Sequence, residues 1–255
     1  MRDIQGENDN RGIELERVGI AGLRYPVCFD DGQLRQNGIA DTAVTVRLQH
    51  DRRGTHMSRM VALVHKHLHR FDPQEFPTVL KTGAYELDAP SITCTVNFPV
   101  STPVIAPASG VESWVVHDVT IEGHWNEGDV HVTTSVTSEV TSLCPCSKEI
   151  SDYGAHNQRS RVTLSIIGRG STPYPLTITE AVHIIEDSSS APAIPLVKRP
   201  DERVLTMQAY DHPVFVEDMA RDISSSCRSR GLTHEVHVRN LESIHSHDAV
   251  AFVAG

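Results

Sequence analysis

The order of strand-like and helix-like segments constrains the fold most, because the same series occurs twice along the chain. Strand segments alternate apolar and polar residues, as in Val44-Thr45-Val46-Arg47-Leu48, whereas helix segments carry an apolar stripe with a period near 3.6 residues. In the first half, strands are predicted at 14–29, 42–50, 92–98 and 114–122, and helices at 55–69 and 73–87. In the second half, strands are predicted at 129–143, 161–167, 235–239 and 249–253, and helices at 175–187 and 213–230.

This ββααββ order, occurring twice, predicts an antiparallel α+β fold rather than alternating βα units. The division near residue 125 predicts two modules, residues 11–125 and 126–255. Residues 1–10 are polar and are predicted to form a flexible tail. The two halves share little residue identity, so the repeat is one of pattern only.

Composition and charge narrow the classes of partner. The 255 residues are 39% apolar and 22% charged, which is enough apolar material for a packed core. A net charge of -10 argues against a nucleic-acid partner, although a small anionic substrate needs only a local basic pocket. Five cysteines without a framework spacing, and no apolar signal or membrane segment, predict a soluble cytoplasmic protein.

Cys144, Cys146 and His156 lie close together on a predicted loop between two strands. Thiolate and imidazole are ligands that zinc prefers, and three protein ligands with an open fourth position form a hydrolytic metal site. We expect one of the two cysteines to be the better metal ligand unless Pro145 bends the loop. The alternative is a pair of structural thiols with an ordinary loop histidine.

Two acids and two histidines have both a structural and a chemical interpretation. Glu202 and Glu217 each stand where a helix could begin, so each is either a first-turn acid or a functional carboxylate. Glu202 could bind a metal, and Glu217 could accept two parallel N–H bonds from a guanine or pterin edge. His245 and His247 precede the last strand, where they are either solvated or transfer protons near neutral pH.

Six segments, in this order, closely resemble the type IB (FolE2-like) GTP cyclohydrolase family, and the resemblance extends from about residue 13 to the C-terminus. They are Gly54-Thr55-His56-Met57-Ser58-Arg59, Ser142-Leu143-Cys144-Pro145-Cys146-Ser147-Lys148-Glu149-Ile150, Gly154-Ala155-His156-Asn157-Gln158-Arg159-Ser160, Lys198-Arg199-Pro200-Asp201-Glu202, Phe215-Val216-Glu217-Asp218-Met219 and Glu242-Ser243-Ile244-His245-Ser246-His247. The resemblance implies a tunnelling fold, in which tandem ββααββ modules assemble into a β-barrel as a homotetramer with active sites at subunit interfaces.

The resemblance also implies a reaction and residue roles. GTP and water would give 7,8-dihydroneopterin triphosphate and formate, the first step of folate biosynthesis. One divalent metal per subunit, zinc or manganese with iron(II) as a further candidate, would be held by Cys144, His156 and Glu202. Cys146 would assist nearby, Glu217 would bind the guanine edge, and His245 and His247 would handle protons. The implied triphosphate donors are Lys148, Arg159, His56 and Arg59.

Two other functions stay open at this stage. A tunnelling-fold nitrile reductase would attack a deazapurine with a cysteine nucleophile and NADPH, and it would need no metal. A zinc-storage protein would use the fifteen histidines of the chain, bind several ions per subunit and leave GTP unchanged. These histidines are scattered rather than gathered in a tract, which disfavours storage.

Overall fold

The structure is a computed structural model that describes residues 4–255. Its strands are β1 (Leu15–Asp30), β2 (Arg35–Leu48), β3 (Arg70–Phe71), β4 (Ser91–Ile105), β5 (Glu112–Asn126), β6 (Asp129–Leu143), β7 (Asn157–Arg169), β8 (Ala191–Pro192), β9 (His234–Asn240) and β10 (Ala249–Ala254). Its helices are α1 (Met57–Leu63), followed by a π-helical turn η1 (Val64–Leu68), α2 (Phe76–Glu86), α3 (Pro145–Ile150), α4 (Ile178–Asp187), α5 (Arg199–Asp211) and α6 (Val216–Ser229).

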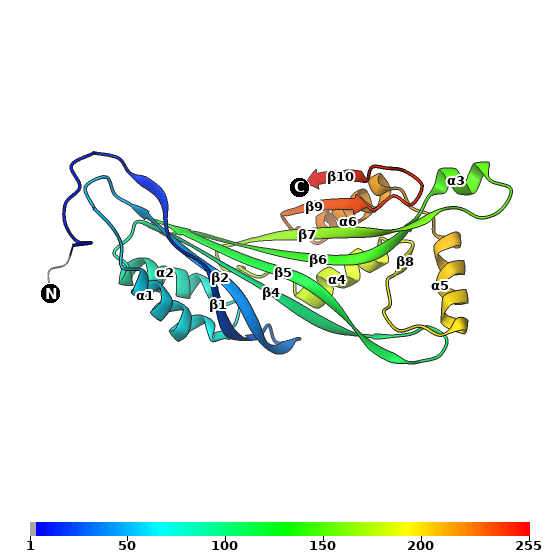
Figure 1. Cartoon of the computed structure of the whole chain (residues 1–255), viewed down its shortest axis with the longest axis horizontal. Helices are drawn as coiled ribbons and strands as arrows, with labels where there is room; N and C mark the ends of the chain where they lie inside the picture. Colours follow the sequence, from blue (N-terminus) through cyan, green and yellow to red (C-terminus); the bar gives the residue numbers. More distant parts are fainter. Residues whose placement is uncertain (1–3) are drawn as a thin grey trace. The chain divides into compact units, whose positions relative to one another are not determined.

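The strands hydrogen-bond in the order β10-β9-β7-β6-β5-β4-β2-β1-β3, and β8 pairs with β6 (Figure 1). The pairs β1–β2, β2–β4, β7–β9 and β9–β10 are antiparallel, whereas the short β3 runs parallel to β1. The predicted antiparallel α+β class is therefore confirmed. Closure of such sheets into a barrel across several copies stays a prediction.

Two compact units share the long strands. The first contains the described residues up to Phe98, together with Thr120–Thr134 and Ile167–Pro175, and the second contains Pro99–Val119, Ser135–Ile166 and Leu176–Gly255. Strands β4 to β7 each contribute residues to both units. The division of the chain into two modules at residue 125 stays a prediction.

In the first unit, α1 and α2 bury their apolar side chains against the sheet. Met60, Leu63, Phe76 and Leu80 are each at most 2% exposed. Helix α2 lies so close to β5 that a Cβ added at Gly123 would come within 2.5 Å of Leu80 Cδ1. A residue without a side chain is therefore required at this position.

The start of the described chain is held by backbone hydrogen bonds. Residues 5, 7 and 9 bond to the segment that follows β2, with Gly54 N donating to Gln5 O at 3.2 Å and Arg53 N to Glu7 O at 3.0 Å. Of the predicted tail, residues 1–3 lie outside the described part of the chain. Gln5, Gly6 and Asn8 of this segment line a pocket of the first unit.

In the second unit, α4 and α6 supply the apolar layer. Both are amphipathic, as predicted, with Ile178, Ile185, Met219 and Ile223 fully buried. Helix α6 packs on β9 and β10 and touches α4. Strand β9 is in turn paired to β7, with Val238 opposite Val162, so the beginning of α6 and the end of β9 are held in one rigid layer.

The exposed face of the long strands carries polar cross-strand pairs as well as apolar residues such as Trp114 and Val116. Cross-strand hydrogen bonds join Ser135 to Ser165 at 2.7 Å and Thr137 to Thr163 at 2.8 Å in the second unit. In the first unit, Thr95 donates to Glu122 at 3.0 Å. An antiparallel sheet can present such a face to water, because the helices cover only its other side.

Two helices depart from the prediction. Helix α3 occupies part of the loop predicted around the cysteines, because Pro145 at its first position has the backbone angle that a helix needs. Helix α5 carries few apolar residues and buries only Asp201 and Ala209, so it lacks the apolar stripe from which a helix is predicted. None of the helices in the described part of the chain has the length and apolar composition needed to span a lipid bilayer.

Candidate active site

A pocket of about 280 Å³ in the second unit gathers the side chains that could do chemistry. Six of the residues predicted from the sequence line it: Cys144, Cys146, His156, Glu217, His245 and His247. They come from the β6–α3 junction, the start of β7, the start of α6 and the loop between β9 and β10. The remaining walls are formed by Ser142, Gln158, Val214, Phe215, Val216, Asn240, Glu242 and Ala249.

Cys144 and Cys146 both line this pocket at the junction of β6 and α3. Cys144 is the N-cap of α3, its sulfur accepts a weak hydrogen bond from Ser147 N at 3.5 Å, and Pro145 starts the helix. Both cysteines line the pocket although α3 begins between them, at Pro145. Cys144 is partly buried and Cys146 is exposed.

The backbone of His156 is held on both sides. Its carbonyl accepts from Cys144 N at 3.0 Å, and its N–H donates to Ser147 Oγ at 3.2 Å. The ring Nδ1 lies 2.8 Å from Gln158 Oε1 and 3.9 Å from Glu242 Oε2. With a side chain only 12% exposed, His156 keeps its ring at the pocket wall.

A chain of buried polar groups forms the floor of the pocket. Ser160 Oγ donates to Asn240 Oδ1 at 2.6 Å, Asn240 Nδ2 donates to Ser142 Oγ at 3.1 Å, and Ser142 Oγ donates to Val214 O at 2.8 Å. These bonds connect β7, β9, β6 and the segment before α6. Each polar group in this series has a hydrogen-bond partner. The floor of the pocket is therefore held in place.

Glu217 lies in the first turn of α6 but does not cap the helix. Asp218 does so, because Phe215 N donates to Asp218 Oδ2 at 3.2 Å. Glu217 is thus in the first turn, as one interpretation from the sequence has it, but the capping hydrogen bond is made by its neighbour. The exposed carboxylate of Glu217 lines the pocket instead.

The two histidines of the β9–β10 loop lie against each other and near His156. The rings of His245 and His247 are stacked with centroids 5.2 Å apart, and the His245 ring is 6.3 Å from that of His156 in an edge-on arrangement. Imidazoles so placed can receive and deliver protons within the pocket.

Glu202 is not brought to this pocket within one chain. It is exposed in the first turn of α5, roughly 14 Å along the helix axis from Asp211. It is the far end of α5 that approaches the pocket, where Val214 N donates to Leu143 O at 3.1 Å. Within residues 4–255, no three histidine, cysteine, aspartate or glutamate side chains form a group that could hold a metal ion.

Asp201, next to Glu202, takes the structural role at the start of α5. Its fully buried carboxylate accepts from Ala108 N at 2.8 Å, Ser109 N at 2.7 Å, Ser109 Oγ at 2.7 Å and Lys198 N at 2.8 Å. Burial by itself would raise the pKa of Asp201, but the hydrogen bonds from Ser109, Lys198 and Ala108 outweigh it and hold this pKa well below its usual range.

Two predicted triphosphate donors have other partners in this structure. Lys148 Nζ donates to Tyr210 O at 2.5 Å and lies 4.2 Å from the centroid of the Tyr210 ring. Arg159 pairs with Glu139 at 3.1 Å and is not in the wall of the pocket that holds Cys144.

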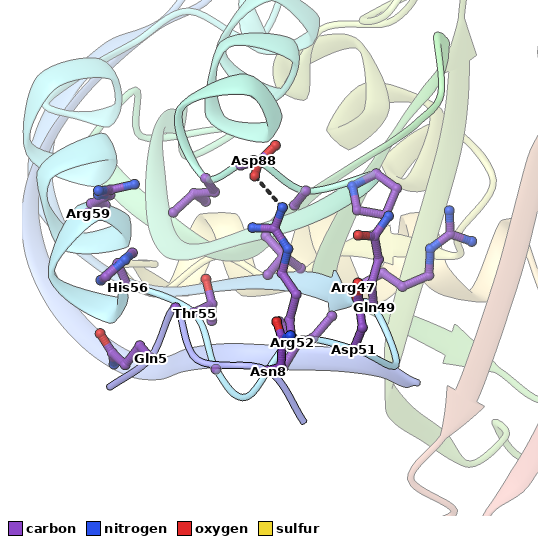
Figure 2. Close-up of a pocket in the computed structure, with 17 residues that line it drawn as sticks. Gln5, Asn8, Arg47, Gln49, Asp51, Arg52, Thr55, His56, Arg59 and Asp88 are labelled. Atoms are coloured by element: carbon purple, nitrogen blue, oxygen red, sulfur yellow. Dashed lines mark hydrogen bonds and ion pairs between the residues drawn. The ribbon is translucent and has the colours of Figure 1, made fainter. Parts of the chain in front are cut away.

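The other two predicted donors, His56 and Arg59, line a different, polar pocket of about 410 Å³ in the first unit. Figure 2 shows His56 and Arg59 near each other, while Arg52 reaches Asp88 at 2.5 Å. Arg47 also lines this pocket, so its walls carry more cationic than acidic side chains. Such a cavity suits an anion with several oxygens.

The sequence analysis missed Gln158 and Glu242 as members of the candidate active site. Gln158 stands two residues after His156, at the start of β7, and residues two apart in an extended chain lie on the same side. Glu242 stands three residues before His245 and is close to His156 only because the β9–β10 loop folds over the start of β7. The spacing could have identified Gln158, whereas Glu242 required the tertiary structure.

Comparison with known proteins identifies the family of the chain. A profile of the family described as Type I GTP cyclohydrolase folE2 matches residues 1–251. The GTP cyclohydrolase FolE2 of Herminiimonas arsenicoxydans is 38% identical over 253 residues, covering 98% of this chain and 95% of that protein. The FolE2 protein of Neisseria gonorrhoeae is 38% identical over 256 residues, covering 100% and 98%.

Among solved structures, uricase from Arthrobacter globiformis, a tunnelling-fold protein, superposes with a TM-score of 0.55 at 7% identity, covering 94% of this chain and 92% of that one. At this identity the likeness shows the fold alone. The profile match and the identity to the FolE2 proteins, both over nearly the whole chain, show the family: this chain belongs to the type I GTP cyclohydrolase FolE2 family.

Proposed function

We propose that this chain is a metal-dependent GTP cyclohydrolase, a hydrolase acting on carbon–nitrogen bonds in a cyclic amidine. It would convert GTP and water to 7,8-dihydroneopterin triphosphate and formate, the first step of folate biosynthesis. One observation carries the proposal: two thiols, three imidazoles and two carboxylates from four separate chain segments line a single pocket in a member of this family.

The donor types at this pocket suit zinc, manganese or iron(II). Cys144 and His156 are partly buried, neighbouring thiol and imidazole groups, and in our proposal they hold the metal together with Glu202. When bound, the metal would supply a Lewis acid that lowers the pKa of water for attack on C8 of guanine. Cys146, on the exposed first turn of α3, remains an auxiliary group beside Cys144.

We infer that Glu202 reaches this site from a second copy of the chain. It lies outside the pocket of its own chain, whereas Cys144 and His156 line it. This supports the interfacial site and the homotetramer implied by the family resemblance. A monomer would then lack one ligand and be inactive.

Glu217 binds the guanine edge in this proposal. Asp218 provides the helix cap, so the Glu217 carboxylate remains available to accept two parallel N–H bonds from N1 and the exocyclic amine of guanine. A carboxylate suits this role because it is purely an acceptor. His245 and His247 are stacked at the pocket wall. They would transfer protons as the five-membered ring of guanine opens and formate leaves.

The triphosphate would be bound by basic groups. His56 and Arg59 share a polar pocket with Arg47 and Arg52, which supports this role. Lys148 and Arg159 would first have to leave Tyr210 and Glu139. We therefore rank them below His56 and Arg59 as donors to the triphosphate.

The test is turnover of GTP by the purified protein with added Mn²⁺ or Zn²⁺, with and without prior chelation. Formate release and the fluorescence of the oxidised pterin are followed. Metal-dependent formation of both products is the expected result, and Cys144→Ala should abolish it together with bound metal. Retained activity after complete metal removal would refute the proposal. Reduction of a nitrile-bearing deazapurine with NADPH, without metal, would instead identify the alternative reductase.

A further inference from the structure

We propose that Gln158 is a positioning residue that fixes His156 in the tautomer whose Nε2 is free to bind a metal. This inference rests on the proposed metal site, because it concerns one of the ligands of that site. It assigns a role to a residue that had none in the sequence analysis. It follows from one hydrogen bond and the residues around it.

The hydrogen bond decides where the imidazole proton lies. Gln158 Oε1 is 2.8 Å from His156 Nδ1. An amide oxygen can only accept, so Nδ1 must carry the proton. A neutral imidazole has a single N–H, and Nε2 is therefore left with a free lone pair, which is the form that a metal binds. With the amide turned the other way, its N–H would donate to Nδ1 and Nε2 would carry the proton.

The Nδ1–H group of His156 donates to Gln158 rather than to Glu242. Glu242 Oε2 lies 3.9 Å from Nδ1, which is beyond hydrogen-bonding distance. Gln158 is only 7% exposed, and it is the second residue of β7, which begins directly after His156. Its strand is held to β9 nearby, where Ser160 donates to Asn240. The amide therefore contacts the ring from a rigid strand, whereas Glu242 lies on a loop.

The backbone of His156 adds to this constraint. It is fixed by Cys144 N and Ser147 Oγ, which orients the Cα–Cβ bond, and the bond to Gln158 then sets the rotation of the ring. Outer groups of this kind change the affinity of a metal site by roughly 10- to 100-fold when they are removed. We expect a loss of this size when Gln158 cannot accept a hydrogen bond.

The first experiment measures Zn²⁺ affinity of the full-length apo protein in competition with a chromogenic chelator. Gln158→Leu should bind Zn²⁺ roughly 10- to 100-fold more weakly than wild type. Gln158→Glu keeps an acceptor and should bind at least as tightly as wild type. Ser165→Ala, which removes a buried hydroxyl of the same strand away from the pocket, is the matched control and should leave the affinity unchanged.

Cys144→Ser separates failure of this inference from failure of the proposed function. If Cys144→Ser binds Zn²⁺ as tightly as wild type, the metal site itself is wrong. If Cys144→Ser loses the metal while Gln158→Leu retains wild-type affinity, the site stands and the role of Gln158 is refuted.

A second measurement needs no variant at Gln158 and covers the case in which Gln158→Leu fails to fold. Two-bond ¹H–¹⁵N spectra of histidine-labelled apo protein report the tautomer of each ring. The His156 signals are identified from their loss in His156→Asn. We expect the Nδ1–H form for His156, and observation of the Nε2–H form would overturn the inference.

Discussion

His117 makes folding stability sensitive to mild acid. It is 1% exposed in β5, where its Nε2 lies 2.8 Å from Thr102 Oγ1 and its Nδ1 lies 3.0 Å from Ser138 Oγ. Burial lowers the pKa of His117 from its ordinary value of 6.5 to about 4, against a small opposing effect of Asp118. The folded protein therefore keeps this imidazole neutral at a pH where the unfolded chain already binds a proton.

The sign and size of the effect follow from linkage. Between pH 6.5 and pH 4 the unfolded state binds more protons than the folded state, so the free energy of unfolding falls as the pH falls through this window. With these two pKa values, lowering the pH from 7 to 5 costs about 2 kcal/mol, and the cost approaches about 3 kcal/mol at pH 4.

The assay is urea unfolding at pH 7 and pH 5, at one protein concentration, for wild type and His117→Gln. The amide keeps a donor and an acceptor for Thr102 and Ser138 but does not titrate. Wild type should lose about 2 kcal/mol more than His117→Gln between the two pH values. The same exchange at exposed His50 controls for the loss of an imidazole. Equal losses in wild type and His117→Gln would show that the reasoning about burial is wrong.

Three further changes test other parts of the structure. Gly123→Ala should destabilise the protein by about 1–3 kcal/mol in urea unfolding, since the new Cβ would clash with Leu80, while Gly38→Ala meets nothing within 4 Å and should be nearly neutral. Glu217→Gln should leave bound metal unchanged but weaken GTP binding roughly ten- to a hundredfold, because one acceptor oxygen becomes a donor; unchanged affinity would remove Glu217 from the guanine site. Asp201→Asn should speed amide exchange at Ala108 and Ser109, whose N–H groups bond to the carboxylate, and equal exchange rates would contradict that anchoring role.

The elements predicted most accurately are those with strong local periodicity. The strand predicted at 129–143 coincides with β6 (Asp129–Leu143), and the amphipathic helix predicted at 175–187 overlaps α4. The start of helix α5 near Glu202 was anticipated, but its extent was not predicted, because the helix buries little on one face and its start is stabilised by contacts with a distant hairpin through Asp201. In its first turn, Asp201 accepts the capping hydrogen bond from Lys198 N, whereas Glu202 is exposed.

The same contrast applies to the candidate active site. The identity of its reactive groups was evident from the sequence, because Cys144, His156 and Glu217 lie in segments of recognisable pattern and composition. Their meeting depends on bonds between residues far apart in the chain, such as Ser160 to Asn240 and Asn240 to Ser142. Local periodicity reports which face of an element is buried, but it carries no information about which elements pair.

By itself, the sequence determined the class of fold, the family and the chemical groups available for catalysis, because each of these depends on residue type and local spacing. Only the tertiary structure decided that Asp218 rather than Glu217 caps α6, that Glu242 stands beside His156, and that Glu202 lies away from the pocket. These outcomes depend on the direction of single side chains, and that direction is set by strand pairing and helix packing across long separations in the chain.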